Sequence, residues 1–300
     1  MSVIKQYLTP KQKALAINLD PNIYGTFAEI GAGQETVRHF FRAGAASQTI
    51  AKAMSAYDKD YSDAIYGKEE KNRYVTQNRL KKMLRHEVGL IQERLDNEEN
   101  AHRKFFSFAN TVTTINYQKT FLGHGWVGIM FQAQPGQEYS EIVLHVKFKE
   151  NDATLQQETL GNLGVNLVYG AFHLYDNPRR LIKSLYDDIS IDKIEIDMID
   201  FQGPAFPYVD NRLMSLQLIK NSMTEAVIFN SEGKNMLPAD LLYKKDVFAV
   251  RGSFRPVTLV NVDMFENGLK MFQKDTEGNP EDTVILFEIT VSNLKASGNL

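Results

Sequence analysis

The sequence predicts an α/β or α+β protein, and two observations carry this prediction. Helical patterns dominate the first 110 residues, whereas β-rich runs become frequent only beyond them. In the last third of the chain, short apolar runs alternate with helical patterns, which is typical of an α/β layer with mostly parallel strands. The 300 residues, 43% of them hydrophobic, are enough to bury a sizeable core.

Residues 1–110 are expected to form a helical N-terminal region. Its clearest helix runs from Thr76 to Leu95, where apolar side chains recur at helical spacing and Lys, Arg and Glu occupy the opposite face. Residues 111–149 contain β-rich runs and the turn signal QPGQEYS, so we expect a small antiparallel β meander there. The meander belongs to a mixed β and α/β region, 111–300, which is expected to pack as one unit with the first.

The C-terminal α/β layer is predicted from a series of short apolar runs. They are KIEIDMIDF, EAVIFN, VFAVRGS and DTVILFEITV, and helical patterns such as RLMSLQLIKN and PADLLYK lie between them. Strands that alternate with helices favour parallel pairing, so mostly parallel strands are expected in this layer.

Composition excludes several classes of protein. A net charge of -3, from 34 basic and 37 acidic residues, argues against a dedicated nucleic-acid binder. The absence of cysteine excludes disulfides, thiolate metal sites and cysteine nucleophiles. No run approaches the roughly 18 apolar residues that a membrane span needs, and the N-terminus does not resemble a signal peptide. We therefore expect a cytoplasmic protein without a membrane partner.

The stretch GTFAEIGAGQETVRHFFRAG, residues 25–44, has the layout of a cofactor-binding turn. Gly31 and Gly33 follow a short apolar run and precede a helical pattern, as in dinucleotide and S-adenosylmethionine sites. Glu35 stands where a third glycine is expected, and a carboxylate at a helix N-terminus competes with an anionic ligand. A cofactor loop and a purely structural turn are both compatible with these residues, which favour the structural turn.

A second glycine turn follows the apolar run VFAV and opens an amphipathic helix. It resembles the first motif of the adenylyltransferases that build pantetheine and nicotinate cofactors. The matching residues are Gly252, Ser253, Phe254, Pro256, Val257 and Thr258. This resemblance implies ATP as a ligand, with Arg251, Gly252, Ser253 and Arg255 binding phosphate. It also implies catalytic roles for Thr258 and Asn261, but Asn261 replaces a histidine and carries no titratable proton.

A broader resemblance extends over most of the chain. The stretches YGTFAEIGAGQE, QQETLGNLGVNLVYGAF, IEIDMIDFQGPAF and VRGSFRPVT together are similar to a bacterial family of nicotinate-nucleotide adenylyltransferase-like proteins. Members of that family are considerably longer. The resemblance therefore implies that this chain is the N-terminal portion of a longer protein and that a C-terminal half or another protein is its partner.

A group of carboxylates is the candidate metal site. Glu195 and Asp197 alternate with isoleucines, so on a strand they share one face, and Asp200 lies at the strand's carboxyl end. Hard carboxylate oxygens at Asp197 and Asp200 suit Mg²⁺. A polar strand face without a metal explains the same spacing.

The histidines show no metal-binding spacing, so no zinc site is expected. His124 is singled out because glycines and the only tryptophan flank it, and His145 alternates within LHVKF on a predicted strand. A structural role is the simpler interpretation of both.

Two functional hypotheses follow. The leading one is a nucleotide- or phosphate-binding protein that resembles adenylyltransferases, with catalytic competence left open and with ATP and Mg²⁺ as its cofactors. The alternative is a non-catalytic binding or assembly module. Glycine turns and the carboxylate strand favour the first hypothesis, whereas the missing motif histidine favours the second.

Overall fold

The computed structural model describes residues 7–69, 73–276 and 282–296, and the chain forms two compact units. Unit 1 covers Met1–Ala226, and unit 2 covers Val227–Leu300. This boundary differs from the expected one near residue 110. Strands from both sides of residue 110 pair in one sheet, so the first 110 residues pack together with those that follow them in unit 1.

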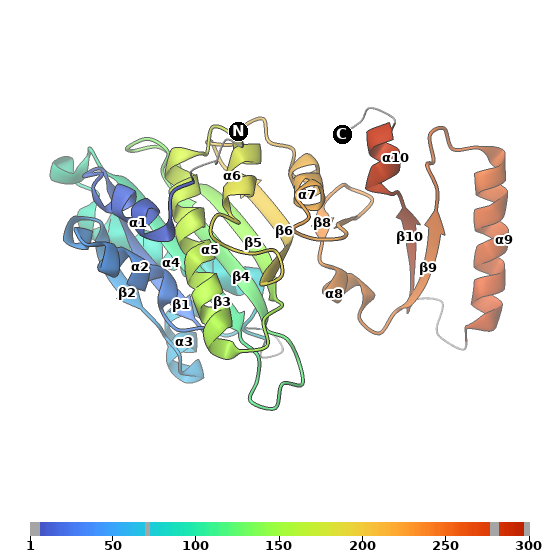
Figure 1. The fold of residues 1–300 in the computed structure, drawn as a ribbon, viewed down its shortest axis with the longest axis horizontal. Coiled ribbons are helices and arrows are strands. Elements are labelled where there is room, and N and C mark those ends of the chain that lie inside the picture. The colour runs from blue at the N-terminus through green and yellow to red at the C-terminus, as the bar shows by residue number, and fades with distance from the viewer. Residues whose placement is uncertain (1–6, 70–72, 277–281, 297–300) are drawn as a thin grey trace, which may run out of the picture. The chain divides into compact units, whose positions relative to one another are not determined.

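Unit 1 contains one six-stranded sheet with the strand order β2-β1-β3-β4-β5-β6 (Figure 1). Its elements, in chain order, are α1 (Pro10–Asn18), β1 (Ile23–Ile30), α2 (Glu35–Ala43), β2 (Ile50–Met54), α3 (Lys59–Tyr66), α4 (Gln77–Leu95), β3 (Lys104–Thr113), β4 (His124–Phe131), β5 (Ser140–Phe148), α5 (Ala153–His173), α6 (Pro178–Ser184), β6 (Ile194–Gln202) and α7 (Asn211–Lys220).

Both parallel and antiparallel pairs occur in this sheet, and the α/β fold class is confirmed. β1 runs parallel to β2 and β3, whereas β3, β4, β5 and β6 are successive antiparallel neighbours. The expected meander is present as β3, β4 and β5. Its strands are buried on both faces, which explains their nearly continuous apolar sequence.

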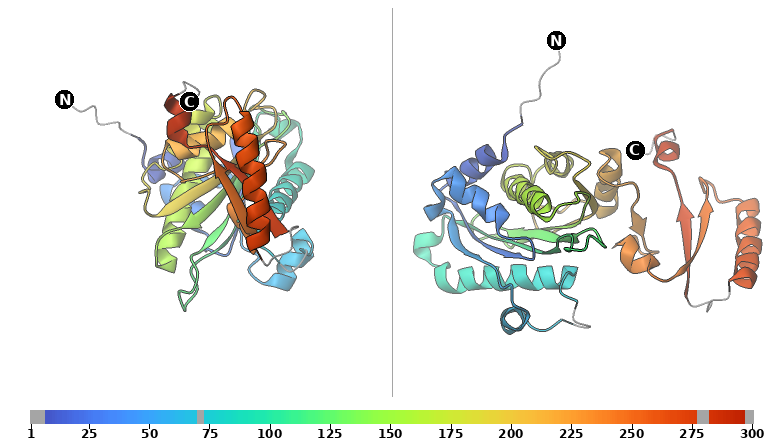
Figure 2. Two further views of the ribbon diagram at one scale, coloured as in Figure 1. Left: turned by 90° about the vertical axis from the view of Figure 1, so that its right-hand side faces the viewer. Right: turned by 60° about the horizontal axis from the view of Figure 1, so that its bottom comes forward.

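Helices cover both faces of the sheet. α4 packs against β1, β3 and β4 on one face, and α5 lies on the other face with α1 and α2 beside it (Figure 2). The helix predicted from Thr76 to Leu95 is confirmed, and Thr76 is its N-cap, accepting a hydrogen bond from the Arg79 amide. On the α5 side, Phe27 packs against Phe40 and Phe108 with ring centroids 5.0 and 5.5 Å apart.

The strand β6 differs from the expected parallel arrangement, because it is antiparallel to β5. After α5 has crossed the sheet, α6 and the turns up to residue 193 return the chain to the end where β5 finished. There the Lys149 amide donates a 2.8 Å hydrogen bond to the Lys193 carbonyl. A single crossing helix between two strands makes the second strand parallel to the first. Here the additional return segment makes β6 antiparallel to β5.

Unit 2 is a smaller α/β unit, also shown in Figure 1. Its elements are β7 (Ile228–Phe229), β8 (Asn235–Met236), α8 (Pro238–Leu242), β9 (Asp246–Arg251), α9 (Leu259–Asp275), β10 (Thr283–Glu288) and α10 (Val291–Ala296). β9 and β10 pair in parallel, as expected, with Asp246 opposite Thr283 and Arg251 opposite Glu288. β7 instead pairs with β8 in an antiparallel hairpin.

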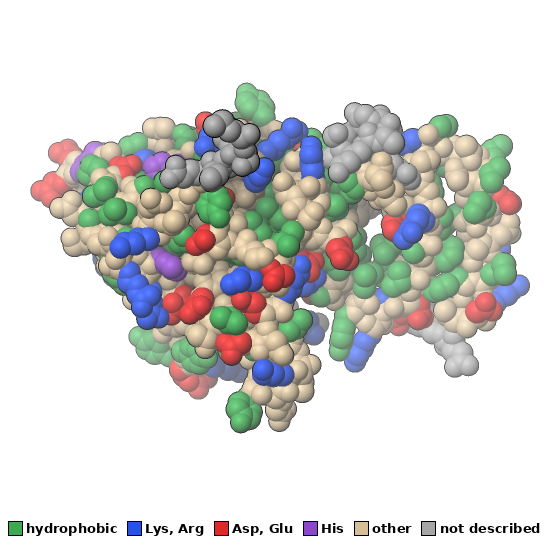
Figure 3. Space-filling view, in the orientation of Figure 1, with side chains coloured by type: hydrophobic (Ala, Val, Ile, Leu, Met, Phe, Trp, Pro, Cys, Tyr) green, Lys and Arg blue, Asp and Glu red, His purple; other side chains and the backbone are tan. Residues whose placement is uncertain are grey.

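Acidic and basic side chains are interspersed on the visible face of the molecule (Figure 3), in agreement with the small net charge. Within the described ranges, every helix is too short or too polar to cross a membrane.

Candidate functional site

The loop between β9 and α9 holds three of the four residues that the adenylyltransferase-like motif singled out for phosphate, Gly252, Ser253 and Arg255, and the fourth, Arg251, is the last residue of β9. Residues 252–258 join the carboxyl end of β9 to the first turn of α9, and the Gly252 amide donates a 3.1 Å hydrogen bond to the Glu288 carbonyl. Because β9 and β10 are parallel, their carboxyl ends lie at the same edge. Ligands of α/β folds bind outside this edge, and phosphate groups bind at helix N-termini.

Thr258 and Asn261, the predicted catalytic pair, form the cap of α9. The Thr258 hydroxyl accepts a 3.3 Å hydrogen bond from the Asn261 amide, and the Asn261 side-chain oxygen accepts a 2.9 Å bond from the Thr258 amide. This reciprocal capping box fixes the helix start. The geometry therefore gives both side chains a positioning role, and a catalytic role for them stays a prediction.

Two backbone amides at the start of α9 have no acceptor in the described part of the chain. No described residue accepts a hydrogen bond from the amide of Leu259 or Val260. The first amides of a helix have no partner inside the helix, so they require water, a side chain or a ligand. The capping box leaves these two amides free to meet an external acceptor.

The two arginines beside the loop differ in their partners. Arg251 forms a 2.7 Å ion pair with Glu288, whereas Arg255 is exposed and has no ion-pair partner among the described residues. Phe254 has a left-handed backbone (φ 50°), and its ring packs edge-on against Phe287 with centroids 5.4 Å apart. This contact anchors the loop to β10 while Arg255 and the exposed Ser253 remain accessible.

Asp197 and Asp200, the predicted Mg²⁺ ligands, lie on β6 in unit 1 and have protein partners of their own. Asp197 contacts His145 Nδ1 through one oxygen (2.6 Å) and Lys147 Nζ through the other (2.7 Å). Asp200 accepts a 2.6 Å hydrogen bond from Asn211. In the described part of the chain, no three His, Asp or Glu side chains gather as metal ligands would. The Mg²⁺ assignment gains no support from this arrangement and stays a prediction.

The pKa values of these two carboxyl groups move in opposite directions. Burial acts to raise the pKa of Asp197, but the hydrogen bond and charge of His145, together with Lys147, outweigh it and hold that pKa below its ordinary value. Burial raises the pKa of Asp200, although the hydrogen bond from Gln202 opposes it. The lowered pKa of Asp197 agrees with its contacts to His145 and Lys147, which favour the charged carboxylate.

His145 joins Asp197 to His124 in a partly buried network that the sequence did not reveal. His145 Nε2 lies 3.4 Å from His124 Nδ1, and the Trp126 ring centroid is 4.9 Å from that of His145. A β-bulge between His145 and Val146 shifts the register, so that Asp197 is the extra residue on β6. Bulges leave no simple sequence pattern, so the alternation of residues alone could not place Asp197 beside His145. Chemically, a buried carboxylate of this kind orients an imidazole and selects its tautomer.

The glycine turn at residues 31–33 has the geometry of a structural turn. The carboxylate of Glu29, at the end of β1, accepts hydrogen bonds from the Thr36 and Val37 amides at 3.2 and 2.9 Å. Asn110 donates a third bond at 3.0 Å. A protein carboxylate therefore already occupies the position at the α2 N-terminus where a phosphate binds in cofactor loops. The competing carboxylate is Glu29, whereas Glu35, noted from the sequence, pairs with Arg38 at 2.9 Å.

We expect the stability of unit 1 to depend on pH through Glu29. Burial raises the pKa of Glu29 from its ordinary 4.5 to about 7, against the hydrogen bonds from Val37, Thr36 and Asn110 that lower it. Between these pH values the folded chain binds a proton that the unfolded chain lacks, so the contribution of Glu29 to stability falls as pH rises. Glu29→Gln removes the titrating group. From pH 4.5 to 8 the unfolding free energy of the wild type should therefore fall by on the order of 3 kcal/mol relative to that of Glu29→Gln. Urea titrations at several pH values measure it, and a pH-independent difference would contradict the assignment.

No protein-family model matches the chain, and no curated protein matches it. Solved structures give a weak similarity. The chain is similar to a competence-damaged protein (CinA) superfamily protein from Enterobacter cloacae at 14% identity and a TM-score of 0.40, over 55% of this chain and 92% of the other. The competence/damage inducible protein CihA from Agrobacterium tumefaciens is 14% identical, with a TM-score of 0.38 over 55% of this chain and 99% of the other. A CinA superfamily protein from Escherichia coli is 15% identical, with a TM-score of 0.36 over 60% of this chain and 94% of the other. TM-scores this low support no inference about activity.

Proposed function

We propose that residues 251–261 of unit 2 bind the phosphate groups of a nucleotide such as ATP. The observation that carries the proposal is the position of the loop 252–258 in a parallel β–α–β unit, between the carboxyl end of β9 and the first turn of α9. Phosphates favour this position because backbone amides point at the ligand and the helix dipole attracts negative charge.

The charges and donors around the loop suit a phosphate. Arg255 is exposed and unpaired among the described side chains, and a guanidinium donates two parallel hydrogen bonds to phosphate oxygens. The amides of Leu259 and Val260 supply further donors, and Ser253 adds a hydroxyl. Arg251 is already paired with Glu288, so its contribution to binding is smaller.

Binding, rather than catalysis, is the role proposed for this loop. Thr258 and Asn261 use their side chains on each other and on the helix start, and an amide side chain transfers no proton. The resemblance of residues 252–258 to the first motif of nicotinate and pantetheine adenylyltransferases supports a nucleotide as the ligand. A relation to nicotinate-nucleotide adenylyltransferase-like proteins is thus part of the proposal. Asp197 and Asp200 are not part of it, because they have their own partners in unit 1.

Replacing Arg255 by alanine is expected to weaken ATP binding about tenfold, because a charge-assisted contact worth roughly 1.5 kcal/mol or more is lost. Isothermal titration calorimetry at low salt measures the dissociation constants for ATP and for inorganic pyrophosphate. If phosphate groups carry recognition, the substitution should weaken both ligands by similar factors.

Lys270→Ala is the matched control, because Lys270 is an exposed cation farther along the same helix α9. It should leave both dissociation constants unchanged. Equal loss of affinity in the two variants would show that overall charge, and not the loop, attracts the nucleotide. Absence of ATP binding by the wild type would refute the proposed function.

A second candidate, a non-catalytic assembly role, is favoured by exposed apolar side chains on α9. Leu259, Val260, Met264 and Met271 are each between 61% and 88% exposed. Exposed apolar groups gathered on one element are typical of interaction surfaces. Sedimentation that reveals association in the absence of nucleotide would support this role, and Met264→Glu should then abolish the association.

A further inference from the structure

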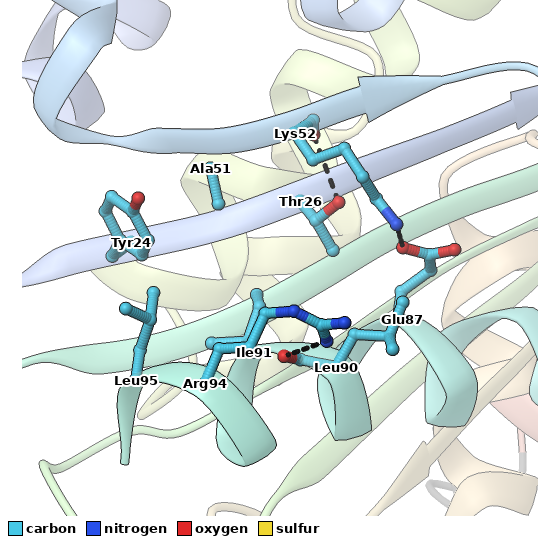
Figure 4. A pocket seen from close by; sticks show the side chains of 9 residues that line it. All are labelled: Tyr24, Thr26, Ala51, Lys52, Glu87, Leu90, Ile91, Arg94 and Leu95. Atoms are coloured by element: carbon cyan, nitrogen blue, oxygen red, sulfur yellow. Dashed lines mark hydrogen bonds and ion pairs between the residues drawn. The ribbon is translucent and has the colours of Figure 1, made fainter. Parts of the chain in front are cut away.

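A groove on unit 1 lies between α4 and the strands β1 and β2, of which β2 is at the edge of the sheet, and it has a cavity volume of about 410 Å³. This volume falls within the range of small-molecule sites in proteins. Strands β1 and β2 form one wall with Tyr24, Ala51 and Lys52, and α4 forms the other (Figure 4). The groove belongs to unit 1 alone, so its properties do not depend on nucleotide binding by unit 2.

One part of the groove is apolar. Leu90, Ile91 and Leu95 of α4 line it together with Ala51 and the ring of Tyr24. Figure 4 shows Tyr24 and Leu95 at one end of the groove, away from the polar end. An aromatic or aliphatic group of a ligand that binds here would therefore bury its own apolar surface together with that of the groove.

The other end carries a neutralised ion pair between a buried glutamate and a partly exposed lysine. Glu87 is fully buried, and its two oxygens contact Lys52 Nζ at 2.6 Å and the Tyr66 hydroxyl, which donates at 2.8 Å. Because Lys52 balances Glu87, this pair contributes little net charge to the groove. It supplies a polar wall fixed by contacts inside the protein.

Arg94 gives the groove an excess positive charge. Figure 4 places its side chain between the two ends, where it donates a 3.1 Å hydrogen bond to the Leu90 carbonyl. Its ion pair with Glu93 is 3.5 Å long and both side chains are more than half exposed, so solvent screens it strongly. The Arg103 guanidinium lies 4.3 Å from the centre of the Tyr24 ring and holds that ring in place, but Arg103 does not line the groove. An anionic group on a ligand in the groove would meet Arg94.

We propose that this groove binds a small apolar carboxylate, with the apolar body between Tyr24 and α4 and the carboxylate on Arg94. A carboxylate only accepts hydrogen bonds and a guanidinium only donates them, so the two groups pair in their ordinary charged forms. A neutral ligand of the same shape would leave the excess positive charge unpaired.

The test uses 1-naphthaleneacetate as the probe and 2-(1-naphthyl)ethanol as its uncharged counterpart. Calorimetric titration of the full chain should give at least tenfold weaker binding for the alcohol. Arg94→Gln should weaken binding of the acid about tenfold and leave the alcohol unaffected. Arg38→Gln is the matched control, since Arg38 is also an exposed arginine paired with a neighbouring glutamate, but lies on α2 across the sheet. Its affinity for the acid should equal that of the wild type.

Ala51→Trp fills the groove from an exposed position of β2, so the fold should tolerate it. This variant should bind neither compound while keeping the wild-type thermal unfolding midpoint. Full affinity of folded Ala51→Trp would place the probe elsewhere and overturn the proposal. Three other outcomes would also overturn the proposal. The acid and the alcohol could bind with equal affinity, the two arginine substitutions could weaken binding of the acid equally, or the wild type could bind neither compound.

Discussion

Replacing Gly31 by alanine is expected to destabilise unit 1 by about 4 kcal/mol, which is an exceptional loss for one methyl group. Gly31 has a left-handed backbone (φ 102°), and a Cβ atom there would lie 1.8 Å from the carbonyl oxygen of Val112. Val112 is part of β3 in the centre of the sheet, so its carbonyl cannot move without breaking strand pairing. Urea unfolding followed by the fluorescence of Trp126, the only tryptophan and a buried residue of unit 1, measures the effect.

Gly33→Ala is the matched control. Gly33 lies in the same turn and also has a left-handed backbone (φ 70°), but the nearest atom to its added Cβ would be the flexible Gln157 side chain at 3.7 Å. Only the backbone penalty applies there, so a loss of about 1 kcal/mol is expected. Equal losses at Gly31 and Gly33 would show that backbone conformation alone, and not the approach to β3, requires glycine in this turn.

The second large effect is expected at Arg79, whose removal should cost about 3–5 kcal/mol, because it leaves buried acceptors and carboxylates without their cation. Arg79 is 1% exposed and donates hydrogen bonds to the carbonyl (2.9 Å) and hydroxyl (2.6 Å) of Ser62. It also lies 3.6 Å from Glu69 and 3.8 Å from Asp63. Arg79→Ala should therefore detach α3 from α4 and lower the urea midpoint of the Trp126 transition.

Lys82→Ala separates this network from ordinary surface charge. Lys82 lies one turn farther along α4 and contacts the same Glu69 at 2.8 Å, but its side chain is 37% exposed. Solvent screens such a pair, so a loss of at most about 1 kcal/mol is expected. A loss at Lys82 as large as that at Arg79 would mean that neutralising Glu69, rather than the carbonyl contacts, is the main role of Arg79.

Local patterns predicted the elements that depend on neighbouring residues. The α4 helix, the meander and the β9–α9–β10 unit follow from periodicity and turn residues within short windows. β1 was missed as a strand, because Gly25, Thr26 and Glu29 interrupt its apolar pattern. Its pairing partners β2 and β3 begin about 27 and 81 residues after its first residue. Strand order and the boundary after Ala226 are likewise set by pairing between distant segments.

The same distinction applies to the candidate sites. Residues 251–261 are contiguous, so a local motif was enough to place them together at one strand-to-helix turn. The contact of Asp197 with His145 joins residues 52 positions apart across a bulge, and the groove joins β1, β2 and α4. Alternation on a strand indicates which residues share a face, but it does not identify the neighbouring strand.

Titration of ¹⁵N-labelled protein with ATP, followed at the backbone amides, tests phosphate binding by unit 2 most directly. Amides at the start of α9 should move most, above all Leu259 and Val260, which have no acceptor among the described residues. Inorganic pyrophosphate should shift the same signals in the same direction. Shifts confined to other parts of the chain, or unchanged signals over residues 251–261 at millimolar ATP, would contradict phosphate binding by this loop.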